Sequence, residues 1–82
     1  MEVSVEISMY PLGREYVPDI QDFIDRLQAH AGVTCQVNGM STQVFGQYHK
    51  VMKAITDEMG SSFKQEGKSV FVMKVINAHL QQ

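Results

Sequence analysis

The sequence predicts an α+β domain in which two helices pack on one face of a four-stranded antiparallel sheet. Three observations lead to this prediction. Residues 2–10 alternate between apolar and polar side chains, and residues 20–27 and 51–63 carry apolar side chains at helical spacing. An Asn-Gly pair at 38–39 separates two further strand-like segments. The resulting order, β-α-β-β-α-β, is that of the ferredoxin-like plait, in which the first strand lies between the third and the fourth.

The first strand is predicted at "EVSVEISMY", residues 2–10. Its alternation is strict, which is typical of a strand with one buried face. The apolar set consists of Val3, Val5, Ile7 and Met9, and the opposite set of Glu2, Ser4, Glu6, Ser8 and Tyr10. We expect the strand to end at Pro11, which suits the second position of a turn that Gly13 closes.

Two amphipathic helices follow from the spacing of apolar residues. Pro18 suits a first helical turn, and Asp19 suits the positive end of a helix dipole. Gly32 is a natural stop for this helix. A second helix is expected over residues 47–64. The two apolar stripes are Ile20, Phe23, Ile24 and Leu27, then Val51, Met52, Ile55, Met59 and Phe63.

Three more strands complete the predicted sheet. "VTCQV", residues 33–37, alternates, and Asn38–Gly39 predicts a two-residue hairpin turn into "MSTQVFG", which Gly46 ends. "VFVMKVI", residues 70–76, is rich in β-branched side chains and leads into a short tail.

Length, charge and cysteine content restrict the class of protein. At 82 residues the chain forms one domain, residues 1–82, with a core that is marginal for its size. The formal net charge of −2 argues against a nucleic-acid-binding protein, which needs a basic surface. The opening "MEVSVEIS" is not a signal peptide, and no apolar run is long enough to span a membrane. The single cysteine, Cys35, fits a reducing compartment, so we expect a cytoplasmic protein.

The last strand indicates self-association. Both of its alternating sets are largely apolar, as in a strand that is buried on both sides, yet the predicted fold has helices on one face only. A second copy of the chain is the simplest cover, so we expect a homodimer or homotetramer formed through the sheet face. Glu6 and Lys74 are expected to pair across adjacent strands.

Catalytic and metal-binding patterns are absent from the sequence. Cys35 lies between Val33 and Val37 like a small buried hydrophobe, without the neighbours that activate a thiolate. The three histidines, at positions 30, 49 and 79, have no partner at metal-ligand spacing. Phosphate-loop and dinucleotide fingerprints are also missing. We expect neither enzymatic activity nor a metal or cofactor.

Two blocks, "EISMYPLG" and "NGMSTQVFG", together with "VFVMKV", give the chain its resemblance to a known family. Over residues 2–76 it resembles the thiamine-binding protein family, the YkoF-like proteins. The resemblance implies a ferredoxin-like fold, assembly through the sheets into dimers or tetramers, and no catalysis. Some members bind thiamine or its hydroxymethylpyrimidine part and are linked to salvage or uptake of the vitamin.

The residues that suit such a ligand come from the polar run 41–43 with its neighbours and from the first predicted strand. An aminopyrimidine needs fixed hydroxyl or amide partners and an apolar or aromatic wall, and the thiazolium of thiamine carries a positive charge. Glu6 suits the charge. The expected polar partners are Thr42, Ser41, Asn38 and Ser8, and the expected wall is Tyr10, Met40 and Phe45.

Each of these residues also fits a plain structural role. Threonine favours strands, Ser41 and Gln43 suit a solvated face, and Phe45 suits a subunit interface. Two functions therefore stay open: a non-catalytic small-molecule binding protein, or an oligomeric interaction or regulatory module without a vitamin ligand.

Overall fold

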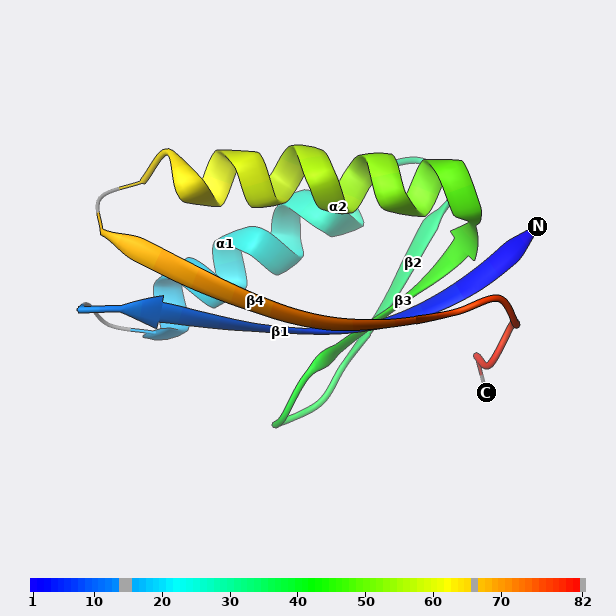
Figure 1. Cartoon of the computed structure of the whole chain (residues 1–82), viewed down its shortest axis with the longest axis horizontal. Coiled ribbons are helices and arrows are strands. Elements are labelled where there is room, and N and C mark those ends of the chain that lie inside the picture. The colour runs from blue at the N-terminus through cyan, green and yellow to red at the C-terminus, as the bar shows by residue number, and fades with distance from the viewer. Residues whose placement is uncertain (14–15, 66, 82) are drawn as a thin grey trace.

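The fold follows from a computed structural model that describes residues 1–13, 16–65 and 67–81. Both helices lie on one side of a single sheet, whose strand order is β2-β3-β1-β4 (Figure 1). All strand pairs are antiparallel. The predicted plait and the central place of the first strand are thus confirmed. The elements are β1 (Glu2–Leu12), α1 (Tyr16–Gln28), β2 (Val33–Val37), β3 (Thr42–Gln47), α2 (Tyr48–Phe63) and β4 (Lys68–Ile76).

The core lies between the sheet and the two helices. The apolar set of β1 faces the helices and is almost wholly buried, which confirms the alternation read from the sequence. Leu27 of α1 and Ile55 of α2 pack against this set without exposed surface. Deep burial of branched side chains is the main source of stability in so small a domain.

The predicted turn at Pro11 and Gly13 is wrong, because β1 continues to Leu12. Pro11 lies opposite Ser69 of β4 and is fully buried. The pairing of β1 with β3 ends at Ile7, so the last part of β1 has a neighbouring strand on one side only. Proline is tolerated in such a place, because its missing N–H interrupts no second ladder.

The β2–β3 hairpin is confirmed, but its connection is longer than predicted. Val37 pairs with Thr42, which leaves residues 38–41 as a four-residue loop. A two-residue turn of type I′ needs positive φ at both central positions, and neither Asn38 nor Gly39 has one. Instead, the Asn38 side chain accepts the N–H groups of Met40 and Ser41, at 2.8 and 3.0 Å. A change of register by two residues leaves the alternation of side chains between the two faces of the sheet intact.

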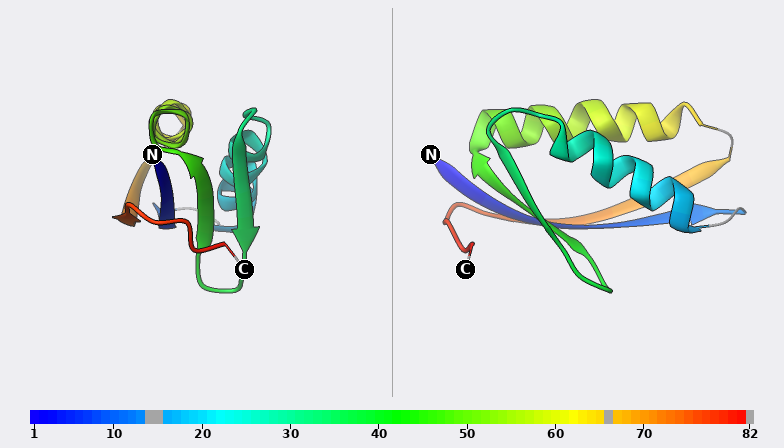
Figure 2. Two further views of the ribbon diagram at one scale, coloured as in Figure 1. Left: turned by 90° about the vertical axis from the view of Figure 1, so that its right-hand side faces the viewer. Right: turned by 180° about the vertical axis from the view of Figure 1, so that it is seen from behind.

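The segment after β4, residues 77–81, folds back across the sheet face opposite the helices (Figure 2). The Ser4 hydroxyl donates to the carbonyl of Ala78 at 2.7 Å and accepts the N–H of Leu80 at 2.9 Å. The ring of His79 lies edge-on to that of Phe45, with centroids 6.1 Å apart. Ser4 and Phe45 are buried as a result. The sequence predicted a tail here, without its docking.

Strand β4 forms an edge of the sheet, and many of its side chains are open to solvent. Its exposed apolar residues lie on both faces: Val70, Val72, Met73, Val75 and Ile76. The composition of β4 suggested burial on both sides, but in a single chain neither side of this strand is fully covered.

Candidate ligand-binding site

Two concavities meet at the tip of the β2–β3 hairpin. They form where β3 begins, between the loop 38–41 and the part of β1 that β3 does not pair with. The outer one, which we name the notch, has a volume of about 510 Å³. Its lining is Glu6, Ser8, Tyr10, Asn38, Gly39, Met40 and Ser41.

The inner concavity, which we name the inner cavity, lies between the hairpin and α1 and has a volume of about 420 Å³. It shares the loop residues, Ser8 and Tyr10 with the notch. The remainder of its lining is Ile7, Met9, Ile20, Phe23, Ile24, Val37 and Thr42. Most of the residues that line the inner cavity are therefore apolar, whereas most of those that line the notch carry a polar group.

Three kinds of hydrogen bond fix the loop that separates the two concavities. The carbonyl oxygen of the Asn38 side chain closes the loop on itself, so its NH₂ group is the part left for other partners. Ser41 Oγ donates to Glu6 Oε2 at 3.2 Å, and Ser8 Oγ donates to the Met40 carbonyl at 3.4 Å. The bonds from Ser41 to Glu6 and from Ser8 to Met40 tie the loop to β1 and hold the mouth of the notch in one shape.

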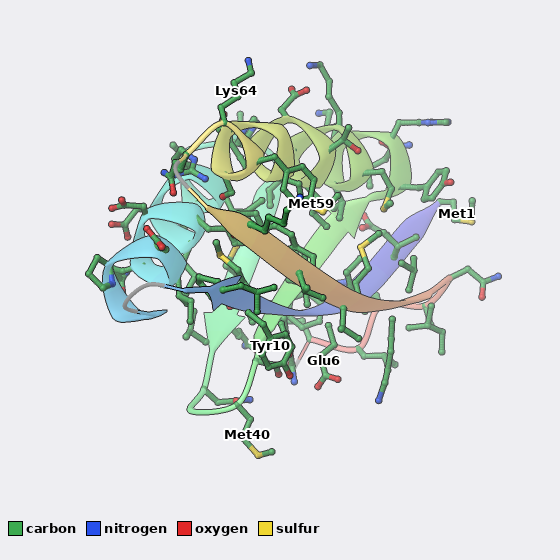
Figure 3. The ribbon with its side chains drawn as sticks, turned by 60° about the vertical axis from the view of Figure 1, so that its left-hand side comes forward. Met1, Glu6, Tyr10, Met40, Met59 and Lys64 are labelled. Atoms are coloured by element: carbon green, nitrogen blue, oxygen red, sulfur yellow. The ribbon has the colours of Figure 1, made fainter. Side chains whose placement is uncertain are left out.

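Six of the eight residues singled out in the sequence line the notch. They come from two separate segments, β1 and the loop 38–41, which the fold brings side by side. Glu6 and Tyr10 lie on the side of the sheet away from the helices, and Met40 lies at the hairpin tip (Figure 3). Met40 is 90% exposed, so it lines the rim of the site.

Thr42 lies on the opposite face of the sheet from Ser41 and lines the inner cavity. It pairs with Ile7 and Val37, both on the helix side. The residue is only 6% exposed, and its hydroxyl makes no hydrogen bond to any residue that the structure describes. The hydroxyl is not among the fully buried polar atoms without a partner, so water or a ligand in the inner cavity can reach it.

Phe45 is separated from the notch, because it lies two pairs further along the sheet, opposite Ser4 and beneath His79. It lines a different groove, beside the segment 77–81. Sequence reasoning missed the α1 side of the site. The helical stripe had identified Ile20, Phe23 and Ile24 as core residues, but spacing alone gave no sign that space remains beside them.

One ion pair borders the notch. Lys74 of β4 lies beside Glu6, with 3.7 Å between Nζ and Oε1, which confirms the predicted cross-strand pair. The Lys74 side chain is 84% exposed and that of Glu6 is 44% exposed. Glu6 is also held by Ser41, so it is the more firmly placed member of the pair.

The residues with nucleophilic or basic potential lie elsewhere. Burial raises the pKa of the Cys35 thiol, which disfavours the reactive thiolate. His30 contacts Glu58 between the two helices. Within residues 1–13, 16–65 and 67–81, no three His, Cys, Asp or Glu side chains are grouped as metal ligands, and no helix is long and apolar enough to cross a membrane.

Solved structures from three organisms share this fold. A hypothetical protein of Methanocaldococcus jannascii is 18% identical with a TM-score of 0.83, over 99% of this chain and 84% of that one. The domain of unknown function DUF77 from Bacillus cereus is 16% identical with a TM-score of 0.76, over 95% of this chain and 77% of that one. A Thermotoga maritima protein described as a candidate thiamine biosynthesis/salvage protein is 16% identical with a TM-score of 0.69. The match covers 99% of this chain and 90% of that one.

Sequence comparison gives the family more directly than these distant structures do. No curated protein matches the chain. The model of the family described as "Thiamine-binding protein" matches residues 5–79, which include all six strands and helices in whole or in large part. The chain therefore belongs to the thiamine-binding protein family.

Proposed function

We propose that the protein binds thiamine, or its hydroxymethylpyrimidine part, at the hairpin tip and does not alter it chemically. Membership of the thiamine-binding protein family supports binding rather than catalysis. The similar Thermotoga maritima protein is described in terms of thiamine biosynthesis or salvage. By the same reasoning we propose a role in salvage or uptake of the vitamin, in the cytoplasm.

The observation that carries this proposal is the Thr42 hydroxyl at a mostly apolar cavity. No described protein group bonds this hydroxyl and it is open to the cavity, so a ligand with a ring nitrogen or an amine can bond it in place of water. The cavity volume of about 420 Å³ falls within the usual range for small-molecule sites. Phe23 and Ile24 supply the apolar wall that a flat pyrimidine needs.

The two concavities suit the two ends of the ligand. We place the aminopyrimidine in the inner cavity, against Phe23 and beside Thr42. The rest of the molecule then extends past the loop 38–41 into the notch, where Ser8 and Tyr10 provide polar contacts. Glu6 lies at the end where the thiazolium of thiamine would be.

An isothermal titration of the wild-type protein with thiamine and with hydroxymethylpyrimidine tests this function. We expect micromolar affinity, about −8 kcal/mol, which suits one small ring held by a few neutral hydrogen bonds. Absence of heat with both compounds at millimolar concentration would leave the interaction-module function in its place.

The exposed apolar side chains of β4 favour self-association, whichever ligand is bound. Val70, Val72 and Ile76 lie on the sheet face without helices, next to Tyr10 and Leu80, and all are exposed in the single chain. We propose that a second copy of the chain covers this face, giving a homodimer or homotetramer. Large exposed apolar patches are uncommon on monomeric proteins of this size.

A further inference from the structure

We infer that the free edge of β4 is a docking site for a second copy of the chain, whose own β4 pairs with it antiparallel and extends the sheet across both copies. β4 stands at one end of the strand order, so its ladder with β1 uses one side of the strand. Among the described residues, no strand pairs with its other side (Figure 2). This pairing is independent of the ligand at the hairpin tip. It also differs from stacking through the outer face, because it joins backbones at the sheet edge.

Stacking through the outer face leaves part of the exposed surface of β4 uncovered. Met73 and Val75 are 37% and 45% exposed, although both belong to the helix-side set of β4. Phe63, at the end of α2, is exposed on the same side, where its ring packs edge-on to that of Phe71. A partner on the outer face does not reach these side chains. A strand added at the edge contacts both faces at once, because its side chains alternate between them.

β4 lacks most of the features by which sheet edges resist pairing. Short strands, prolines, bulges and charged side chains are the usual protections. The nine residues of β4 contain no proline, and they pair with β1 residue for residue, so no bulge interrupts the strand. Its two charges are Lys68 and Lys74. The opposite edge, β2, has five residues and carries the polar Thr34 and Gln36 on its outer face. The edge that is open to pairing is therefore β4.

The sequence of β4 complements itself in the register centred on Val72. All nine residues then pair, and Phe71 lies opposite the partner's Met73, a favourable contact between a ring and a thioether. A shift by two residues in one direction sets Lys68 against the partner's Lys74, and like charges directly opposite are unfavourable. A shift in the other direction leaves the first two residues of β4 unpaired. A two-fold axis through this register keeps the helices of both copies on one side of the joint sheet.

Cross-linking on the helix side of the junction tests this pairing. In the register centred on Val72, Ser69 lies opposite the partner's Val75, whereas the two copies of Ser69 are about 20 Å apart along the strands. Ser69→Cys and Val75→Cys are made in a Cys35→Ala background, because Cys35 is the single native cysteine. A bismaleimide that spans less than half this distance should join the two variants after they are refolded together. Each variant alone should give little covalent dimer.

Met73→Lys tests the same junction without a cross-linker. It places a charge against the partner's Phe71 and should weaken self-association about tenfold or more, as measured by sedimentation. Thr56→Lys, at an exposed position of α2, is the control and should leave self-association unchanged. Circular dichroism verifies that both variants stay folded.

The possible results separate edge pairing from stacking through the outer face. If wild type self-associates but the mixture gives no more covalent dimer than the single variants, edge pairing is wrong and stacking stands. Self-association of Met73→Lys as tight as that of wild type contradicts edge pairing in the same way. If wild type is a monomer at tens of micromolar, both forms of self-association are wrong, and ligand binding is unaffected by that result.

Discussion

The Nε2 atom of His30 lies 2.7 Å from Oε2 of Glu58, and this contact joins the end of α1 to α2. Arg26 completes the cluster: its Nε donates to Glu58 Oε1 at 2.9 Å, and its Nη2 donates to both the Glu58 carbonyl and the Ser62 hydroxyl. The partner of His30 is thus a carboxylate of the other helix, 28 positions away in the sequence.

This cluster predicts a dependence of stability on pH. The hydrogen bond from His30, and then that of Arg26, lowers the pKa of Glu58, while partial burial opposes the change. A carboxyl with a lowered pKa stabilises the fold above the pH range where free glutamate titrates, and this contribution is lost as pH falls through the lowered pKa. Glu58→Gln should reduce the free energy of unfolding by about 1 kcal/mol at pH 7, with the deficit shrinking on acidification.

Urea unfolding followed by circular dichroism at several pH values measures the effect. Asp57→Asn is the control, because Asp57 pairs with Lys53 at the exposed surface of the same helix and should matter less. Equal stability of Glu58→Gln and wild type at pH 7 would contradict the proposed role of the cluster.

Thr42→Val should separate ligand binding from stability. Valine keeps the β-branched shape and removes a hydroxyl that has no described partner, so stability should stay the same or rise. Affinity for thiamine or hydroxymethylpyrimidine should fall about threefold to tenfold. Thr34→Val, at an exposed position opposite Phe45, should leave affinity unchanged. Binding by Thr42→Val as tight as wild type would move the ligand out of the inner cavity.

Two glycines should respond to alanine in opposite directions. At Gly46, φ is +153°, and an added Cβ would lie 2.5 Å from the Gly32 carbonyl oxygen and 3.0 Å from Val51 Cγ2. Gly46→Ala should therefore cost about 2–4 kcal/mol. At Gly60, within α2, an added Cβ meets no atom within 4 Å, so Gly60→Ala should add about 0.5–1 kcal/mol. Chemical denaturation measures both, and similar changes in the two variants would contradict this prediction.

Self-association should depend on the outer face of β4. Val72 lies opposite Ser8 and is 54% exposed in the single chain. Val72→Lys should weaken association by about tenfold or more, because a charge would be buried at the interface. Thr56→Lys, at an exposed position of α2, should leave it unchanged. Sedimentation at tens of micromolar measures the species, and a stable wild-type monomer there would exclude the proposed oligomer.

Sequence patterns predicted those features that depend on neighbours in the chain. The alternation at Val3, Val5 and Ile7 identified the buried face of β1, and the stripe around Leu27 and Ile55 identified the buried faces of the helices. The hairpin at Asn38 was predicted, but its loop length was not. The choice between a two-residue and a four-residue loop depends on where the strand ladder stops, and that is set by packing against β1.

The residues of the site could be predicted from sequence patterns only in part. Neighbouring residues 41 and 42 looked like one polar run, yet a strand directs them to opposite faces, and the loop separates their concavities. Phe45 was grouped with them because of its proximity in sequence. Its true neighbour, His79, comes from a segment 34 positions later, and no local pattern reports such a contact.

The pairing of β1 with β4 ties folding of the domain to the synthesis of β4. Strand β1 forms nine residue pairs with β4, from Ser4–Ile76 to Leu12–Lys68, but only six with β3. On the ribosome, β1 emerges before β4, and its longest ladder cannot be completed until residue 76 has been made. Such non-local pairing folds slowly and leaves apolar strands open to chaperones and proteases meanwhile. A nascent chain arrested before residue 68 would thus be a target for degradation.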